Sequence, residues 1–419
     1  MSIRETIVRL LGGELRSDKV NPVHPKDPVL AEMFNLSNVS STGLRVTSDT
    51  AMEDSAVTAC VRLIAESIAS LPLIYYLRDD KGGKERARDQ ALYELLRYAP
   101  NRSQTPVEFW ELMVAHVLLR GNSYAKIVSS GRQAVEELLP MHPDRVFVFR
   151  APDGRRAYQY TTDSGKQEVY LQDEIFHVPG LSFDGLSGIN PIRYHRETVG
   201  LSLAAKEFGA RTFGQGAHFG GVYEHPTVLS DNAYDRLKKS IDQTSGLSGV
   251  AKTRILEEGM KFNKISMTSE DAQYLESRRF SRSEIASIFR VPPHMIGETD
   301  KSTSWGTGIE QQTIGFIVFT LIPWLTRIEQ ACSRDLISAP DRKRGYFAEF
   351  LLNGLMRGDS AARSAYFKSR WEVGTLSQND IRRLENENPI EGGDTYFVPL
   401  NFRPHTEPWQ GGLKNAPTE

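Results

Sequence analysis

Two long helical segments separated by a short insert constrain the fold of this chain more than any other feature. Apolar residues near one side predict a helix over residues 191–215, and a second long helix is expected over residues 269–289, before Pro292 and Pro293. Residues 217–268 between them read as a small β/α insert. In a monomer, helices that flank a protruding module expose much of their length. A closed ring covers them, because each helix packs against the next subunit, so this order favours an interaction protein.

The remaining segments predict a mixed α+β protein. Apolar residues at three- and four-residue steps predict a helix that has Asp54 or Ser55 as its N-cap and is ended by Pro72. A capping box, Thr105-Pro106-Val107-Glu108, starts a second helix that stops at Gly121. Short strands are predicted over residues 73–77, 124–128, 146–150, 158–162, 169–171 and 175–178. A long helix over 309–336 is expected to kink at Pro323.

Composition excludes several classes of protein. The 51 Lys and Arg residues against 53 Asp and Glu give a net charge of −2, which excludes a generally basic nucleic-acid coat and a polybasic membrane binder. The most apolar run, 314–325, is shorter than the roughly 20 residues that span a bilayer. The two cysteines, Cys60 and Cys332, lie among apolar residues and are expected to be buried free thiols in a reducing compartment.

The N-terminal residues are expected to form an arm. Glu5 interrupts the first apolar stretch, so a signal peptide is not predicted. Ile3, Ile7, Leu10 and Leu11 fall on one helical face, which favours a short helix docked on the parent fold or on a neighbouring copy. Prolines and a Ser/Thr-rich stretch follow, so we expect residues 1–49 to be a flexible N-terminal arm.

Motifs for catalysis are missing from the sequence. Gly83-Lys84 has Arg78 where a phosphate-binding loop needs glycine, and neither Ser nor Thr follows Lys84. The chain contains no Gly-x-Ser-x-Gly and no His-Glu-x-x-His pattern. His116 lies on the apolar face of its helix, which favours a satisfied core histidine over a metal ligand. We therefore expect no catalytic residue, no metal and no cofactor.

A series of short segments, in a specific order and spacing, carries a family resemblance. These segments are residues 60–73, 119–125, 173–177, 184–191, 259–262, 271–274, 285–293 and 357–359. In this series the chain resembles the portal proteins of tailed bacteriophages and prophages, in the family found with siphovirus-type capsids. The resemblance covers residues from about 50 to 395 and implies no catalytic residues.

The resemblance implies the α+β portal fold, assembled as a ring of about twelve subunits. By analogy, residues 50–190 and 292–345 form the wing, 191–216 and 269–291 the stem helices, 217–268 the clip and 346–395 the crown, followed by a disordered tail over 396–419. Similar proteins occupy one capsid vertex of the virion, after assembly in the host cytoplasm. They nucleate head assembly with the major capsid and scaffold proteins, dock the terminase large subunit, pass double-stranded DNA without sequence specificity and hold the head–tail connector. No membrane is involved.

Two sets of candidate residues follow from this analogy. Within the wing, a channel loop over residues 298–308 precedes the kinked helix, and Lys301, Thr303 and Trp305 are its candidates for facing DNA. Family members often carry an aromatic residue and an asparagine soon after the Ser-Thr pair. Here the aromatic is displaced, and a glycine replaces the polar residue. The alternative for Trp305 is that it packs against the wing as a local anchor.

The second set lies in the insert and comprises Arg236, Lys238 and Lys239, candidates for docking the terminase or the connector. The alternative is a solvated face of mixed charge, since Asp235 and Asp242 lie beside them. Two rival functions also stay open. One is a metal-dependent nuclease that acts on packaged DNA, and the other is a structural capsid component without DNA contact.

Overall fold

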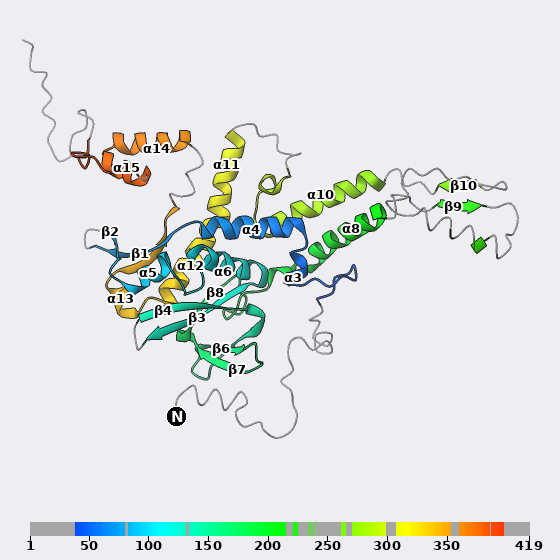
Figure 1. Cartoon of the computed structure of the whole chain (residues 1–419), viewed down its shortest axis with the longest axis horizontal. Helices are drawn as coiled ribbons and strands as arrows, with labels where there is room; N and C mark the ends of the chain where they lie inside the picture. The colour runs from blue at the N-terminus through cyan, green and yellow to red at the C-terminus, as the bar shows by residue number, and fades with distance from the viewer. Residues whose placement is uncertain are drawn as a thin grey trace, which may run out of the picture. The chain divides into compact units, whose positions relative to one another are not determined.

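The computed structural model describes residues 38–79, 83–130, 134–214, 221–224, 234–235, 239, 261–264, 270–298, 307–352, 360–385 and 387–397 of the 419. The chain divides into two compact units, Met1–Phe350 and Leu351–Glu419. Figure 1 labels most of their helices and strands. Among the described residues, no helix is both long and apolar enough to cross a membrane.

Two packed helices form the centre of the first unit. Helix α4 (Ser55–Ala69) begins where Asp54 accepts hydrogen bonds from the backbone N–H groups of Ala56 and Val57. Helix α6 (Pro106–Arg120) begins with the predicted capping box and ends at Gly121, whose φ of 78° suits glycine. The two helices contact each other, and their apolar faces are buried. Both predicted helices are confirmed.

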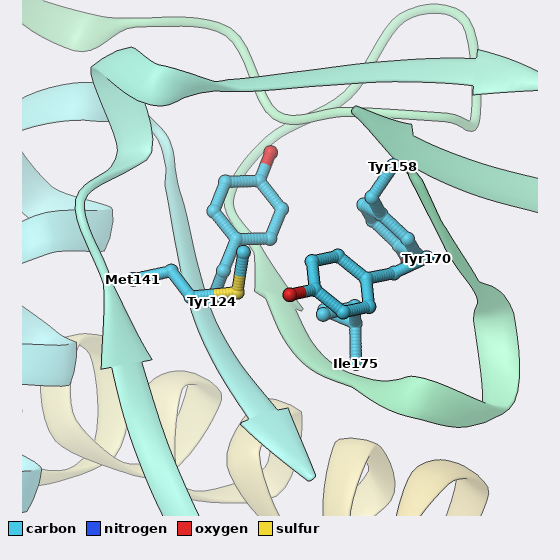
Figure 2. Close-up of a cluster of buried hydrophobic side chains, with 5 residues drawn as sticks. All are labelled: Tyr124, Met141, Tyr158, Tyr170 and Ile175. Carbon is cyan, nitrogen blue, oxygen red and sulfur yellow. The ribbon is translucent and has the colours of Figure 1, made fainter. Parts of the chain in front are cut away.

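Two antiparallel three-stranded sheets follow, and strand β3 of the first contacts α6. The first has the order β4-β3-β8, with strands Ala134–Met141, Asn122–Ser130 and Ile175–Pro179. The second has the order β5-β6-β7, with strands Val146–Arg150, Arg156–Thr161 and Gln167–Leu171. A cluster of buried side chains joins the two sheets (Figure 2), and its members are Tyr124, Met141, Tyr158, Tyr170 and Ile175. Because both sheets contribute to one apolar cluster, they pack as a small sandwich.

A third sheet shows that the predicted start of the crown, at residue 346, is too early. Its order is β11-β1-β2, with strands Tyr346–Phe350, Leu73–Arg78 and Lys84–Arg86. Strand β11 pairs antiparallel with β1 along its whole length. The predicted crown begins at residue 346, whereas the first compact unit extends to Phe350 because β11 completes this sheet.

A long helical segment follows the predicted channel loop. It consists of α11 (Thr307–Phe316), the π-helical turn η6 (Ile317–Leu321) and α12 (Ile322–Asp335). Pro323 lies in the first turn of α12, directly after the π-helical turn, so its missing N–H falls where the helical hydrogen-bond pattern is already irregular. The helix predicted over 309–336 is thus present, and the irregular turn directly precedes the proline at which a kink is expected.

The predicted N-terminal arm is wrong for its last residues. Residues 38–47 form a tight turn with a bridge between Val39 and Arg45, and α3 (Ser48–Ala51) follows. Ser40 and Val46 are buried, and both lie against the backbone of Gly200. The Ser/Thr-rich composition suggested a linker, but these residues fold onto the base of the first long helix.

Short elements complete the first unit, and the second unit is small and helical. The short elements are α5 (Ala91–Arg97), α13 (Ala339–Lys343) and the 3₁₀ turns Pro143–Arg145, Gln172–Glu174 and Pro293–Ile296. The second unit contains α14 (Ser360–Glu372) and α15 (Gln378–Glu385). Its Asn379 side chain is buried and hydrogen-bonds the backbone of Ile390 in both directions. Most of the predicted tail lies outside the described residues.

Candidate assembly site

A pair of long helices extends from the first unit. They are α8 (Arg196–Gly214) and α10 (Glu270–Ile288), each of 19 residues, which contact each other and lie side by side in Figure 1. A short helix, α7 (Pro191–Tyr194), precedes α8, so the predicted first helix is interrupted at His195. The two strands β9 (Gly221–Glu224) and β10 (Lys261–Lys264) pair antiparallel between the helices. The predicted order of helix, strands and helix is confirmed, and the rest of the predicted β/α insert lies mostly outside the described residues.

Hydrogen bonds join the N-terminal half of α8 to the residues that precede α4 and to the turn at Ser41. The Ser202 hydroxyl donates to an Asp54 carboxylate oxygen over 2.5 Å, and the Lys206 ammonium donates to the carbonyl of Glu53 over 2.8 Å. The Ser41 backbone and hydroxyl both donate to the carboxylate of Glu197. These contacts leave another face of α8 open, and there Leu201 exposes more than half of its surface.

Three glycines pack backbone against backbone at the base of this helix pair. The Gly180 N–H donates to the carbonyl of Gly121 over 2.7 Å. A Cβ at Gly188 would lie 2.0 Å from that same carbonyl oxygen, a distance at which atoms overlap. The segments 119–125 and 184–191, which carry the family resemblance, therefore meet here, and glycine is required for the contact.

The side chain of Asn122 ties these segments to His177. Its amide nitrogen donates to the Gly188 carbonyl and its oxygen accepts the Gly188 N–H, both over 2.7 Å. The same oxygen lies 3.0 Å from His177 Nε2, so Nε2 carries the imidazole proton. Nδ1 then accepts the hydroxyl of Tyr158 over 3.2 Å. Burial lowers the pKa of His177 well below its usual value, so the ring is neutral.

Helix α12 forms hydrogen bonds with the backbone of residues 177–180. Arg334 donates to the carbonyl of His177 over 2.6 Å, and the Asp335 carboxylate accepts the His177 N–H over 3.1 Å. Arg327 donates to the carbonyls of Pro179 and Gly180. The base of the helix pair is thus connected, through hydrogen bonds, to the helical segment that follows the predicted channel loop.

An apolar hollow of about 250 Å³ lies at this junction. It is bounded by the end of α6, the residues before α8, the end of α10 and the first turns of α12. Leu181 and Tyr194 stand at its edge with more than half of their surface exposed. Tyr194 also makes an edge-to-face contact with the exposed ring of Phe183. Apolar side chains make up most of its lining, which also includes His195, Arg290 and Arg327.

The predicted channel residues Lys301, Thr303 and Trp305 lie outside the described residues, but the flanks of their loop are described. Glu298 Oε1 lies 3.0 Å from Arg282 Nε on α10, and this carboxylate is largely covered. Helix α11 already begins at Thr307. The loop predicted over 298–308 is therefore anchored at both ends, one of them on the helix pair.

The predicted clip residues are described only in part. Arg236 and Lys238 lie outside the described residues, whereas Lys239 and its neighbour Asp235 are exposed. Sequence reasoning did not foresee the Asn122–His177 contact. Its only signal is that both residues belong to segments of the family resemblance.

The buried sulfur and imidazole groups agree with a structural role. Cys60 and Cys332 are buried free thiols, as expected, and burial raises the pKa of Cys60 to about 12. His116 is buried in the core, and burial lowers its pKa to about 4, yet its Nδ1 has no hydrogen-bond partner. The expectation of a satisfied histidine is therefore wrong for one nitrogen. Across the described ranges, no three His, Cys, Asp or Glu residues are grouped to hold a metal ion.

Comparison with known proteins gives matches over most of the chain. A family model described as phage portal protein matches residues 55–386. The portal protein of Enterobacteria phage HK97 is 35% identical over 360 residues, which cover 85% of this chain and 84% of that protein. These two matches agree with the order of the segments found in the sequence.

Solved structures share the fold. A chain in the neck of a native gene transfer agent particle, computed with C12 symmetry, matches with a TM-score of 0.57 and 22% identity, over 82% of this chain and 94% of its own. An HK97-family phage portal protein from Corynebacterium diphtheriae matches with a TM-score of 0.53 and 16% identity, over 74% and 97%. The helix pair, the sandwich and the sequence matches lead to one conclusion. The chain belongs to the phage portal protein family.

Proposed function

We propose that about twelve copies of this chain form a ring at one capsid vertex, and that double-stranded viral DNA is packaged and later ejected through its central channel. The observation that carries the proposal is the α8/α10 pair, which extends from the first unit with exposed apolar residues on both helices. Such residues need a covering partner, and a neighbouring subunit supplies one. The twelvefold symmetry of the neck that contains a chain of the same fold supports a ring of this size.

In this proposal, residues 50–190 and 292–345 form the wing and the helix pair forms the stem. Residues 217–268 form the clip, and the second unit forms the crown. The clip docks the terminase large subunit during packaging and the head–tail connector afterwards, with Arg236, Lys238 and Lys239 as contact residues. Before packaging, the ring nucleates the head together with the major capsid and scaffold proteins. The assembled virion then holds the ring at its vertex.

The loop between Glu298 and α11 supplies the channel constriction in the same proposal. One end of the loop is held by the pair between Glu298 and Arg282 of the stem, and the other continues into the helix clamped by the Arg334 contacts. Lys301, Thr303 and Trp305 of every subunit then surround the DNA. Their contacts are repeated and weak, because DNA must slide past them.

Microscopy tests the proposed ring against a capsid component without DNA contact, and a cleavage assay tests it against a nuclease. Purified protein should give rings with a central hole by negative-stain microscopy, and a mass near twelve times 47.1 kDa. Discs without a hole would favour a capsid component without DNA contact. Cleavage of plasmid DNA in the presence of Mg²⁺ or Mn²⁺, lost with a chelator, would favour the nuclease.

A further inference from the structure

The two stem helices present unlike apolar features. On α8, Leu201 and Phe208 expose 52% and 51% of their surface. Between them lie Ala204 and Ala205, so the four residues follow the spacing i, i+3, i+4 and i+7. Four residues of this spacing form the hole that a side chain of a facing helix fills in coiled-coil packing. On α10, Phe280 exposes 64% of its surface and has the shape of such a knob.

The knob and the hole lie at the same height along the helix pair. The helices have equal length, and His195, directly before α8, borders the same apolar hollow as Ile288, the last residue of α10, so we take the two helices to start at one height. Phe280 lies eight residues from Ile288, and eight residues beyond Arg196 is Ala204. Because both helices rise by about 1.5 Å per residue, Phe280 is level with the centre of the hole.

Phe280 and the hole on α8 lie at equal height, which is what a contact between two copies of this chain in a ring requires. A closed ring needs two different faces on each subunit that match after rotation alone, without a shift along the ring axis. If the two contact faces lay at different heights along the ring axis, each added subunit would be shifted along this axis. The subunits would then form a helical filament instead of a closed ring. Within one subunit, Phe280 and Leu201 are both open to solvent, so the knob is not already seated in its own hole.

We propose that Phe280 of one subunit inserts between Leu201 and Phe208 of its neighbour, above Ala204 and Ala205, and that this contact closes the stem of the ring. The inference rests on the proposed ring and adds its contact residues. The two alanines leave room for the phenyl ring, and the flanking side chains exclude water from it.

Disulfide trapping tests the contact. Phe280→Cys combined with Ala204→Cys should give, after mild oxidation, a ladder of covalent oligomers on a non-reducing denaturing gel, and dithiothreitol should return it to one band at 47.1 kDa. Disulfides need Cα atoms within about 7 Å, so the ladder reports direct contact. Cys60 and Cys332 are fully buried and should not react. Phe147→Cys with Ala204→Cys is the matched control, because Phe147 is similarly exposed on β5, and this pair should stay monomeric on the gel.

Mixing and charge substitutions separate this contact from others. Phe280→Cys subunits assembled with Ala204→Cys subunits should give covalent dimers and nothing larger. Phe280→Asp should shift the mass from the ring to the monomer, whereas Phe280→Leu and Phe147→Asp should keep the ring, with unchanged circular dichroism in all three. If the double-cysteine variant gives monomers and no covalent oligomers, the proposed contact is overturned. Covalent dimers from Phe280→Cys alone would overturn it too. Intact rings of Phe280→Asp would also overturn it and leave the ring itself standing, whereas monomeric wild-type protein would contradict the proposed function.

Discussion

A Cβ atom at Gly121 would lie 1.9 Å from the carbonyl oxygen of Ile189. Gly121 ends α6 with a φ of 78°, and Ile189 precedes the short helix that leads into the stem. The end of α6 and the segment that leads into α8 are therefore joined by direct backbone contact. No rotamer change can relieve this overlap, because the opposing atom belongs to the main chain.

Replacing Gly121 by alanine should lower the free energy of unfolding by at least about 4 kcal/mol, since it combines a strained φ with an unavoidable clash. Gly154→Ala is the matched control, because Gly154 has a φ of 84° but no atom within 4 Å of the added methyl group. The control should cost about 1 kcal/mol. Urea unfolding of both variants measures the difference, and equal losses would contradict the proposed backbone contact.

Asn122→Ala should destabilise the wing by at least about 3 kcal/mol. The substitution leaves the N–H and C=O of Gly188 and the Nε2–H of His177 buried without partners, and each such group costs about 1–3 kcal/mol. The exposed Asn388 offers a control, for which alanine should change the free energy by about 0.5 kcal/mol or less. A Asn122→Ala variant that unfolds at the wild-type urea concentration would show that water replaces the lost bonds.

The helices of this protein follow from local sequence signals. Thr105, Pro106 and Glu108 start α6, and Gly121 ends it, as the sequence predicts. Both long helices are also expected from the sequence, although the one predicted over 191–215 is interrupted at His195. The family resemblance also indicates a structural protein without catalysis, which the portal family match confirms.

Features that depend on distant contacts could not be predicted from the sequence. Strand β4 contains Glu136, Glu137 and Pro140, which argue against a strand, and its pairing with β3 decides its conformation. The glycines at 121, 180 and 188 carry no local pattern that brings them together. Residues 38–47 have the composition of a linker, and only the shape of α8 beside Gly200 explains why they fold.

The stability of the first unit should fall in mild acid, and His116 should contribute to this fall beside the buried His177. Burial lowers the pKa of this imidazole to about 4, and the pKa in the unfolded chain is near 6.5. The folded state therefore favours the neutral ring, so its contribution is complete above pH 6.5 and is lost as the pH falls toward 4. The loss amounts to about 3 kcal/mol at most. His116→Leu should show a smaller decrease in unfolding free energy over this range, and parallel curves for the two proteins would exclude His116 as the cause.

Reversing two charges in the clip should weaken terminase docking and leave the rings intact. Lys239 is exposed, and Lys238 is next to it in sequence. Charges at the rim of an interface act mainly on association, so Lys238→Glu with Lys239→Glu should slow binding of the terminase large subunit by about tenfold or more at low salt. Surface plasmon resonance on assembled rings measures the rate. Unchanged association would favour the solvated mixed-charge face.

Removing residues 301–306 should leave the rings intact and widen the narrowest point of the channel. The deletion spares Glu298, which pairs with Arg282, and α11, which begins at Thr307. Without Lys301 and its copies, the contacts to phosphate that hold DNA during packaging are lost, so completion or retention of the packaged genome should decrease. A Gly/Ser loop of equal length is the control that keeps the chain connection and removes the side chains. Cryo-EM of the rings and nuclease protection of packaged DNA provide the two measurements. A wild-type map with this loop on the outer surface, away from the channel axis, would contradict the prediction.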